Sequence, residues 1–297
     1  MMPRAVTLRP PAKINLTLRV GRTLDSNFHD VKTIMQAIAL CDTLTLTPRK
    51  GPLSLRTTTR AVAADRTNLV WRAADLLWRA SGRPGEPRGV RITLDKAIPV
   101  AAGLGGGSAD AAAALAGLNK VWDLGFPRRD LLRFAAELGS DVPFFLVGGA
   151  AIGTGRGVDV LPLADIDRLG LVVIKPDMGV STADAYRWLD EDRARGVADN
   201  HRPSSEVPVG WPTGPLALVN DLEAPVSRRH PGIVEALSAF TRAGAFAAAM
   251  TGSGSAVFGV FSERAAPKAA RRLARPDWLV WTTRTLSRAE TERRIGL

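Results

Sequence analysis

A glycine cluster near the middle of the chain is the first feature that could do chemistry. The run 99–110 has glycines at 103, 105, 106 and 107, and the alanines 111–114 follow directly. Glycine permits positive φ angles and lets a ligand approach the backbone, and the unpaired N–H groups that begin a helix attract anions. We therefore expect a strand at 89–94, a polyphosphate-binding loop, and a helix over about 108–121. The candidate phosphate contacts are Pro99, Val100, Ala101, Ala102, Gly103, Leu104, Gly105, Gly106, Gly107, Ser108 and Ala109.

The same glycine cluster also fits a plain structural turn. No Lys-Ser or Lys-Thr pair follows the last glycine, so the cluster is not a Walker A loop. Ser108 stands where the dinucleotide-binding fingerprint has its third glycine, and by itself it also suits a helix cap. The chemistry favours phosphate binding, and the structural turn stays open as the alternative.

Three polar side chains outside the glycine cluster could take part in catalysis. Lys13 and Asn15 alternate with aliphatic residues, which places both on the polar face of one strand. Asp141 lies in the tight connection 139–143, outside any run of charges. Periodicity alone predicts a half-exposed strand for the first two residues, and a helix cap or turn is the ordinary role of such an aspartate.

The composition limits the class of protein. A length of 297 residues suits one large domain or two ordinary ones, and a hydrophobic content of 45% can bury a sizeable core. The net charge of +11 comes mostly from dispersed arginines, which is compatible with a polyanionic small substrate or with nucleic acid. No basic run with interleaved aromatics occurs, so we expect no nucleic-acid partner. A basic nucleic-acid-binding protein that kept a degenerate nucleotide fold stays open as an alternative.

Cysteine content and hydropathy point to a compartment. Cys41 is the only cysteine, which excludes an internal disulfide and fits a small buried hydrophobe. Arg4 and Arg9 interrupt the N-terminus, which lacks the apolar core of a signal peptide, and no apolar stretch is long enough to cross a bilayer. We expect a cytoplasmic protein with no membrane partner.

Strands and helices mix along the whole chain, which predicts an α+β fold. We expect two lobes that meet near 150–165, with the chain divided into 1–157 and 158–297. Loops are predicted at 21–30 and 193–211, and short buried strands at 144–147 and 158–161.

Three segments, taken together, resemble a known superfamily. Pro-Ala-Lys-Ile-Asn-Leu at 11–16, Gly-Leu-Gly-Gly-Gly-Ser-Ala-Asp at 103–110 and Thr-Gly-Ser-Gly-Ser-Ala at 251–256 resemble, in order and spacing, the three motifs of the GHMP kinases. The segment 138–145 is similar to a catalytic-aspartate segment of that superfamily. The resemblance spans nearly the whole chain. It implies a two-lobed GHMP kinase fold with an N-terminal ATP-binding lobe and a C-terminal ferredoxin-like lobe.

Within this superfamily, the segments 11–16 and 138–145 more specifically resemble those of the kinases that phosphorylate a cytidine-diphosphate-linked methylerythritol. It implies transfer of the ATP γ-phosphoryl group to a hydroxyl of that polyol, a step of non-mevalonate isoprenoid synthesis. Lys13 and Asp141 match the catalytic pair: Asp141 accepts the hydroxyl proton or orients the hydroxyl, and Lys13 offsets charge on the moving group. Mg²⁺ should arrive with ATP, but the sequence does not identify its protein ligand. We expect a monomer or weak homodimer.

Further residues are assigned by the same resemblance. Asn15 and the turn formed by Thr251, Gly252 and Ser253 would contact the acceptor. Asn68 matches a position near the adenosine, although the start of a helix is its ordinary role.

The cytosine would lie between two aromatic residues. The family typically has Asp-Gly-Tyr-His where this chain has Ser-Asn-Phe-His at 26–29. Phe28 keeps an aromatic face for stacking, His29 reads the cytosine edge, and Tyr186 matches the second aromatic position. A helix residue at the lobe interface is the alternative for Tyr186. Phe28, His29 and Tyr186 favour a cytidine substrate over the acceptors of homoserine, mevalonate or galactose kinases, which stay open as alternatives.

Overall fold

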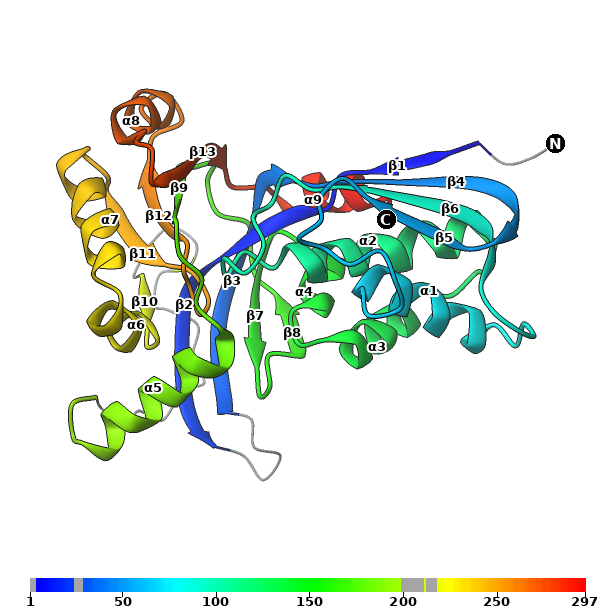
Figure 1. Cartoon of the computed structure of the whole chain (residues 1–297), viewed down its shortest axis with the longest axis horizontal. Coiled ribbons are helices and arrows are strands. Elements are labelled where there is room, and N and C mark those ends of the chain that lie inside the picture. Colours follow the sequence, from blue (N-terminus) through cyan, green and yellow to red (C-terminus); the bar gives the residue numbers. More distant parts are fainter. Residues whose placement is uncertain (1–3, 24–28, 199–210, 212–217) are drawn as a thin grey trace.

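The computed structural model covers the whole chain and describes residues 4–23, 29–198, 211 and 218–297. It is an α+β fold of two lobes with three sheets, and the long strands β2 and β3 run between the lobes (Figure 1). The strands are β1 Val6–Leu8, β2 Pro11–Thr23, β3 His29–Cys41, β4 Thr43–Pro52, β5 Ser54–Thr57, β6 Arg88–Asp95, β7 Ala150–Thr154, β8 Asp159–Pro162, β9 Gly170–Pro176, β10 Val219–Asn220, β11 Ala247–Met250, β12 Val257–Phe261 and β13 Trp278–Arg284. The helices are α1 Leu69–Ala80, α2 Gly106–Val121, α3 Arg128–Leu138, α4 Val142–Val147, α5 Thr182–Ala194, α6 Glu223–Arg229, α7 Pro231–Arg242, α8 Ala266–Leu273 and α9 Arg288–Ile295.

The N-terminal lobe is built around helix α2. Its alanines are buried on every side, and it contacts α1, α3, α4 and strand β4. A Cβ atom at Gly117 would lie 2.2 Å from Leu46 Cδ1, so the small residues let the helix pass close to the sheet β1-β4-β6-β5. Because α2 is held by its neighbours along its length, its N-terminal end is a rigid place for a ligand.

The C-terminal lobe is a four-stranded antiparallel sheet with helices on one side. The strand order is β11-β12-β9-β13, and α7 and α8 pack on the sheet while α5 packs on α6. Alternate apolar residues of β9 and β12 form one hydrophobic core with the helices on that side of the sheet. This is the arrangement expected of a ferredoxin-like lobe.

A separate core joins the two lobes. Ile14 and Ile34, from the sheet β10-β2-β3-β7-β8, pack with Val173 and Phe258 of the C-terminal sheet. Each of these two sheets therefore has one apolar face packed against the other sheet, and this packing holds β2 at the junction of the lobes.

The chain crosses the predicted lobe boundary several times. Strand β8 pairs with β7, and β10 pairs in parallel with β2 at Thr17 and Leu18. Helix α9 returns to contact α2 and α4, and the Leu286 N–H donates to the Ala37 carbonyl at 2.9 Å. The division at 157/158 stays a prediction. Strands β8 and β10, from beyond it, complete a sheet that begins in the first lobe.

Two predicted short strands differ from the structure. Residues 144–147 belong to helix α4, whose side chains are all buried. An apolar run that is buried on every side has no alternation to separate strand from helix. The run at 158–161 falls on β8, which is a strand but is mostly exposed rather than buried.

The strands and helices around the predicted loops are longer than expected. β2 runs to Thr23 and β3 starts at His29, so both ends of the predicted loop 21–30 are strand, and Ser26, Asn27 and Phe28 lie outside the described residues. Helix α5 continues to Ala194, and most of the predicted loop 193–211 is also outside them.

Lys13 and Asn15 lie on a buried face of β2, not on a half-exposed one. The glycine loop packs against the Lys13 side chain, and Thr251 of the C-terminal lobe contacts Asn15. Cys41 is buried as predicted. Among the described residues, no helix is both long and apolar enough to span a bilayer.

Candidate active site

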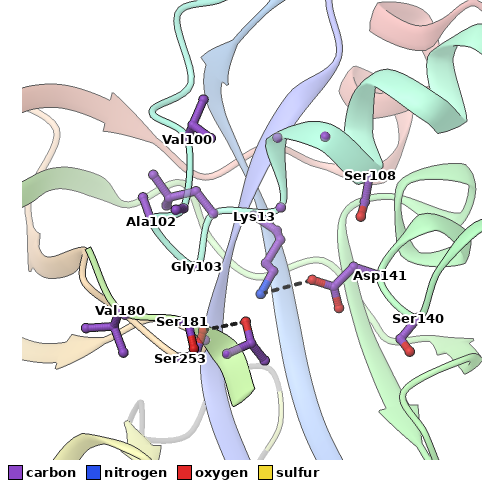
Figure 2. Close-up of a pocket in the computed structure, with 18 of the residues that line it drawn as sticks. Lys13, Val100, Ala102, Gly103, Ser108, Ser140, Asp141, Val180, Ser181 and Ser253 are labelled. Atoms are coloured by element: carbon purple, nitrogen blue, oxygen red, sulfur yellow. Dashed lines mark hydrogen bonds and ion pairs between the residues drawn. The ribbon is translucent and has the colours of Figure 1, made fainter. Parts of the chain in front are cut away.

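A cavity of about 1210 Å³ lies where the two lobes meet. The glycine loop, strand β2, the start of α4, the first turn of α5 and the turn 252–254 all contribute to its lining. Figure 2 shows Lys13 of β2 pointing toward Asp141, with Ser108 on the same side and Ser181 and Ser253 across the cavity. The three motif segments and the aspartate segment, distant in sequence, thus line one cavity.

Lys13 and Asp141 form an ion pair at the bottom of this cavity. Lys13 Nζ lies 3.5 Å from Asp141 Oδ2, and the exposed fractions of the two side chains are 4% and 40%. Asp141 occupies the N-cap position of α4, but its side chain makes no capping hydrogen bond. Its carboxylate is therefore turned to Lys13 and the cavity, which argues against the capping role left open by the sequence.

A chain of hydrogen bonds positions the Lys13 ammonium. Nζ donates to Asn15 Oδ1 at 2.6 Å, and Asn15 Nδ2 donates to Thr33 Oγ1 at 2.7 Å. The Thr33 hydroxyl in turn donates to the Thr17 carbonyl at 2.7 Å. Buried polar groups that are satisfied in this way hold one geometry. Asn15 lines the cavity, and its amide also holds Lys13.

The glycine loop has the backbone geometry of an anion site. Gly103 and Gly105 have φ angles of 73° and 71°, in the left-handed region that favours glycine. The carbonyl of Leu104 accepts from the Lys13 N–H at 3.0 Å, and that of Ala102 accepts from the Ala256 N–H at 3.3 Å. Because the C=O and the following N–H of a trans peptide point in opposite directions, the N–H groups of Gly103 and Gly105 point away from these donors. Together with the first turn of α2 they form a donor-rich surface on the cavity.

Close contacts explain why glycine occupies two of these positions. A Cβ at Gly105 would lie 2.9 Å from Phe145 Cζ and 3.1 Å from Lys13 Cγ. A Cβ at Gly103 would lie 2.1 Å from the Thr251 carbonyl oxygen. The loop therefore packs directly on strand β2 and on the C-terminal lobe.

Two residues of the predicted loop, Gly106 and Ser108, belong to helix α2 and have a different backbone role from the one expected. Helix α2 begins at Gly106, which is not among the residues with positive φ; a side chain there would instead meet Ile98 Cγ2 at 2.9 Å. The N-cap of α2 is Gly105 and has no side-chain capping bond, so Ser108 is not the helix cap. Its hydroxyl lines the cavity instead.

The other predicted nucleotide residues also line the cavity, with one exception on the buried side. Pro99, Val100, Ala101, Ala102, Leu104 and Gly107 line it, while Ala109 is buried in α2 and is not part of the lining. Asn68 starts a helix, as the sequence allowed, and its contact with the adenosine stays a prediction. It caps α1 by accepting from the Val70 N–H at 2.8 Å, and it lines the cavity.

The far end of the cavity has a pair of rings. The His29 and Tyr186 ring centroids lie 4.9 Å apart at an interplanar angle of 31°, and His29 Nε2 lies 2.9 Å from Asp190 Oδ1. Burial, and more weakly the Asp141 charge, raise the pKa of the Tyr186 hydroxyl. The predicted stacking partner Phe28 lies outside the described residues.

The turn at 252–254 closes the cavity from the C-terminal lobe, and Thr251 before it is buried and is not part of the lining. Thr251 Oγ1 accepts from the Asn15 N–H at 3.0 Å, so this threonine ties the turn to β2. Ser253 Oγ lies 3.0 Å from Thr182 Oγ1 at the start of α5. Gly252 has a φ of 55°, and a Cβ there would lie 3.0 Å from the Gly103 carbonyl oxygen. The first and third motifs are thus in direct contact with the glycine loop.

Sequence reasoning missed one charged cluster beside the loop. Lys96 Nζ lies 2.7 Å from Asp110 Oδ2 and also contacts Asp42 Oδ2, and all three side chains are buried. Burial raises the pKa of Asp110 to about 8, although Lys96 opposes that shift. Asp110 belongs to the quoted motif and Lys96 precedes it, but their pairing with Asp42 carries no local sequence signal.

Comparison with known proteins agrees with this geometry. Residues 68–149 match the N-terminal domain of the GHMP kinases, and residues 214–276 match the GHMP kinase C-terminal domain. A Methanococcus jannaschii mevalonate kinase has the same fold, with a TM-score of 0.70 over 96% of this chain and all of that one, at 12% identity. The protein is a GHMP kinase, an ATP-dependent small-molecule kinase.

More similar relatives narrow the assignment. A 4-diphosphocytidyl-2-C-methyl-D-erythritol kinase of Pelotomaculum thermopropionicum is 42% identical over 95% of this chain and 98% of its own. One of Rhodococcus jostii is 42% identical over 86% of this chain and 83% of its own. A crystal structure of 4-(cytidine 5'-diphospho)-2C-methyl-D-erythritol kinase has a TM-score of 0.74 and 32% identity, over 94% of this chain and 99% of that one. Within the GHMP kinases, the chain belongs to the 4-diphosphocytidyl-2-C-methyl-D-erythritol kinase family.

Proposed function

We propose that this kinase transfers the γ-phosphoryl group of ATP to the 2-hydroxyl of 4-diphosphocytidyl-2-C-methyl-D-erythritol. The observation that carries the proposal is the Lys13–Asp141 pair, which shares one cavity with the glycine loop and with the His29–Tyr186 ring pair. The names of the relatives agree with it.

In this reaction the triphosphate lies along the glycine loop and the first turn of α2. The acceptor oxygen attacks the γ-phosphorus, the bond to the bridging oxygen breaks, and ADP leaves. Asp141 accepts the hydroxyl proton or orients the hydroxyl, and the Lys13 ammonium offsets charge on the phosphoryl oxygens. These roles call for positioning more than for covalent chemistry, which suits a lysine held as rigidly as Lys13.

Mg²⁺ is expected to come with ATP, whose charge it neutralises. Within the described part of the chain no group of three or more His, Cys, Asp or Glu side chains could hold a metal ion by itself. Mg²⁺ retains several waters and takes phosphate oxygens readily, so it needs few protein ligands. The Ser108 hydroxyl, which is not used as a helix cap, is the side chain that would contribute an oxygen.

The acceptor's base would lie at the His29–Tyr186 end of the cavity. His29 has ring nitrogens that can hydrogen-bond a base edge, and Tyr186 offers a ring face. An acceptor that places its polyol at Asp141 and its base at these rings spans the cavity. The expectations of a monomer or weak homodimer and of a cytoplasmic location remain predictions.

A panel of acceptors tests the proposed activity. ADP release would be measured with ATP and Mg²⁺ on the cytidine-diphosphate-linked methylerythritol, its uridine analogue, homoserine, mevalonate and galactose. We expect turnover with the cytidine compound and, by phosphorus NMR, a new phosphomonoester at its 2-hydroxyl. Equal or better turnover with homoserine, mevalonate or galactose would contradict the proposal. Retention on DNA with no turnover of any acceptor would favour the nucleic-acid alternative.

A further inference from the structure

The buried cluster of Lys96, Asp42 and Asp110 connects both ends of the glycine loop. The Asp42 carboxylate accepts from the N–H groups of Ala97 and Ile98 at 2.6 and 2.8 Å, which holds the chain where it enters the loop. Asp110 lies in the second turn of α2, after the chain leaves the loop. The Lys96 ammonium contacts both carboxylates, so one cation joins entry and exit.

The general stability of the fold does not account for this cluster. The exposed fractions of the Lys96, Asp42 and Asp110 side chains are 6%, 0% and 3%. Burying ionisable groups in this way is costly, and apolar side chains of similar volume often stabilise a protein as well or better. Asp110 Oδ1 is also buried with no hydrogen-bond partner among the described residues, which adds a further cost.

The cluster lies directly against the surface that would hold the triphosphate. Lys96 and Asp110 belong to the cavity lining. A Cβ atom at Gly106, the first residue of α2, would lie 3.2 Å from Lys96 Nζ. The loop between the two anchors includes left-handed φ angles at Ala101, Gly103 and Gly105, so its own backbone does not form regular structure. An outside clamp is therefore well placed to set its shape.

We propose that Lys96, Asp42 and Asp110 are positioning residues that fix the spacing and direction of the loop's N–H donors for the ATP triphosphate. They act through the backbone and do not touch the acceptor. The inference rests on the proposed function only in that it assigns ATP to this loop. It assigns a role in nucleotide affinity to side chains that take no part in the chemistry.

The test removes one link of the clamp and measures ATP affinity separately from turnover. In Asp110→Ala, Lys96 no longer reaches α2, and we expect the dissociation constant of a non-hydrolysable ATP analogue and the KM for ATP to rise roughly ten- to hundredfold. The KM for the acceptor should stay within about twofold. Asp110→Asn keeps an oxygen for Lys96 and should recover most of the affinity. Asp95→Ala, which removes a neighbouring exposed carboxylate bonded to Thr58, is the matched control and should bind like the wild type.

A second variant separates positioning from folding. Lys96→Met with Asp110→Leu and Asp42→Asn removes the buried charges and fills the space, while the amide oxygen at position 42 can still accept from the N–H groups of Ala97 and Ile98. We expect this protein to fold with a Tm near the wild type and still bind the analogue weakly. Wild-type affinity in the folded triple variant, or an equal rise of both KM values in Asp110→Ala, would overturn the clamp. Because titration with the analogue needs no acceptor, a failure of the clamp is distinct from a failure of the proposed reaction, which would show as a wild-type enzyme that does not use the acceptor.

Discussion

Lys13 Nζ lies 3.5 Å from Asp141 Oδ2, and the same ammonium donates to Asn15 Oδ1 at 2.6 Å. The lysine is thus held by a neutral amide on its own strand and directed to a carboxylate from a different element. Its side chain is almost fully buried, whereas that of Asp141 is open to the cavity. A fixed cation beside an accessible carboxylate is the arrangement that positioning of a phosphoryl acceptor needs.

Asp141→Asn should remove most turnover and leave ATP binding nearly unchanged. The amide keeps the shape of the side chain but cannot accept the hydroxyl proton, and general-base catalysis typically contributes ~10²–10⁴-fold. Single-turnover kinetics and titration with an ATP analogue would measure the two effects. Asp159→Asn, on the exposed strand β8, is the control. A variant with near wild-type turnover would exclude Asp141 from the chemistry.

Asn15→Ala should lower kcat more than it weakens ATP binding. It removes the acceptor that holds Lys13 and leaves Thr33 without one donor. Hydrogen bonds to charged groups contribute about 1.5–3 kcal/mol, so a fall in kcat of roughly ten- to hundredfold is expected. Steady-state kinetics with saturating ATP would measure it. If kcat is unchanged while only the acceptor KM rises, Asn15 binds the acceptor and does not position Lys13.

Gly105→Ala and Gly107→Ala form a matched pair on the loop. Gly105 has a φ of 71°, which is unfavourable for alanine, and a Cβ there would lie 2.9 Å from Phe145 Cζ. At Gly107, inside α2, the atom nearest to an added Cβ is Leu69 Cδ1 at 3.9 Å. The first substitution should lower the Tm and weaken ATP binding, because it displaces the loop and Lys13. The second should raise the free energy of unfolding by up to about 1 kcal/mol, as expected for glycine to alanine in a helix. Equal Tm values for the two variants would contradict the loop geometry.

Tyr186→Ala and Tyr186→Phe test the base end of the cavity. Stacking of a base on an aromatic ring contributes ~1–3 kcal/mol, so the alanine variant should raise the acceptor's dissociation constant by roughly one to two decades. The phenylalanine variant keeps the ring and should change it little. His29→Ala should reduce the preference for cytidine over uridine, since edge hydrogen bonds carry base identity. Isothermal titration with both diphosphate polyols measures these effects; wild-type binding by Tyr186→Ala would move the base elsewhere.

Glu290→Gln should lower stability at neutral pH but not in strong acid. The hydrogen bond from Arg284 is the main cause that lowers the pKa of Glu290 to about 2, and Ser287 and Arg168 act in the same direction. A carboxyl with a lowered folded-state pKa stabilises the fold above its unfolded pKa, near 4.3. That contribution is lost as pH falls through about 2. After allowance for solvent screening we expect about 1–3 kcal/mol at pH 7. Urea unfolding of both proteins from pH 7 to pH 2 should show the difference vanish; a constant difference would assign it to the capping box of α9 instead.

The sequence by itself determined the class of fold and indicated candidate residues for the site. The order of the motifs around Lys13, the glycine loop and Thr251 is enough to indicate a GHMP kinase. Strand alternation around Lys13 predicted β2, and the glycine cluster with its alanine run predicted β6 and α2 close to their observed bounds. These signals are local, because spacing of apolar residues and capping residues acts over a few positions.

Only the tertiary structure decided what each site residue contacts. Lys13 is buried because the glycine loop, distant in sequence, packs against its side chain, and Asp141 faces the cavity and not its own helix. Gly106 proved to be helical, and the left-handed φ angles fell at Gly103 and Gly105. Residues 144–147 formed a helix because burial on all sides leaves no periodic signal. Lys96, Asp42 and Asp110 met because separate strands and α2 bring them together, and long-range packing of that kind leaves no trace in neighbouring residues.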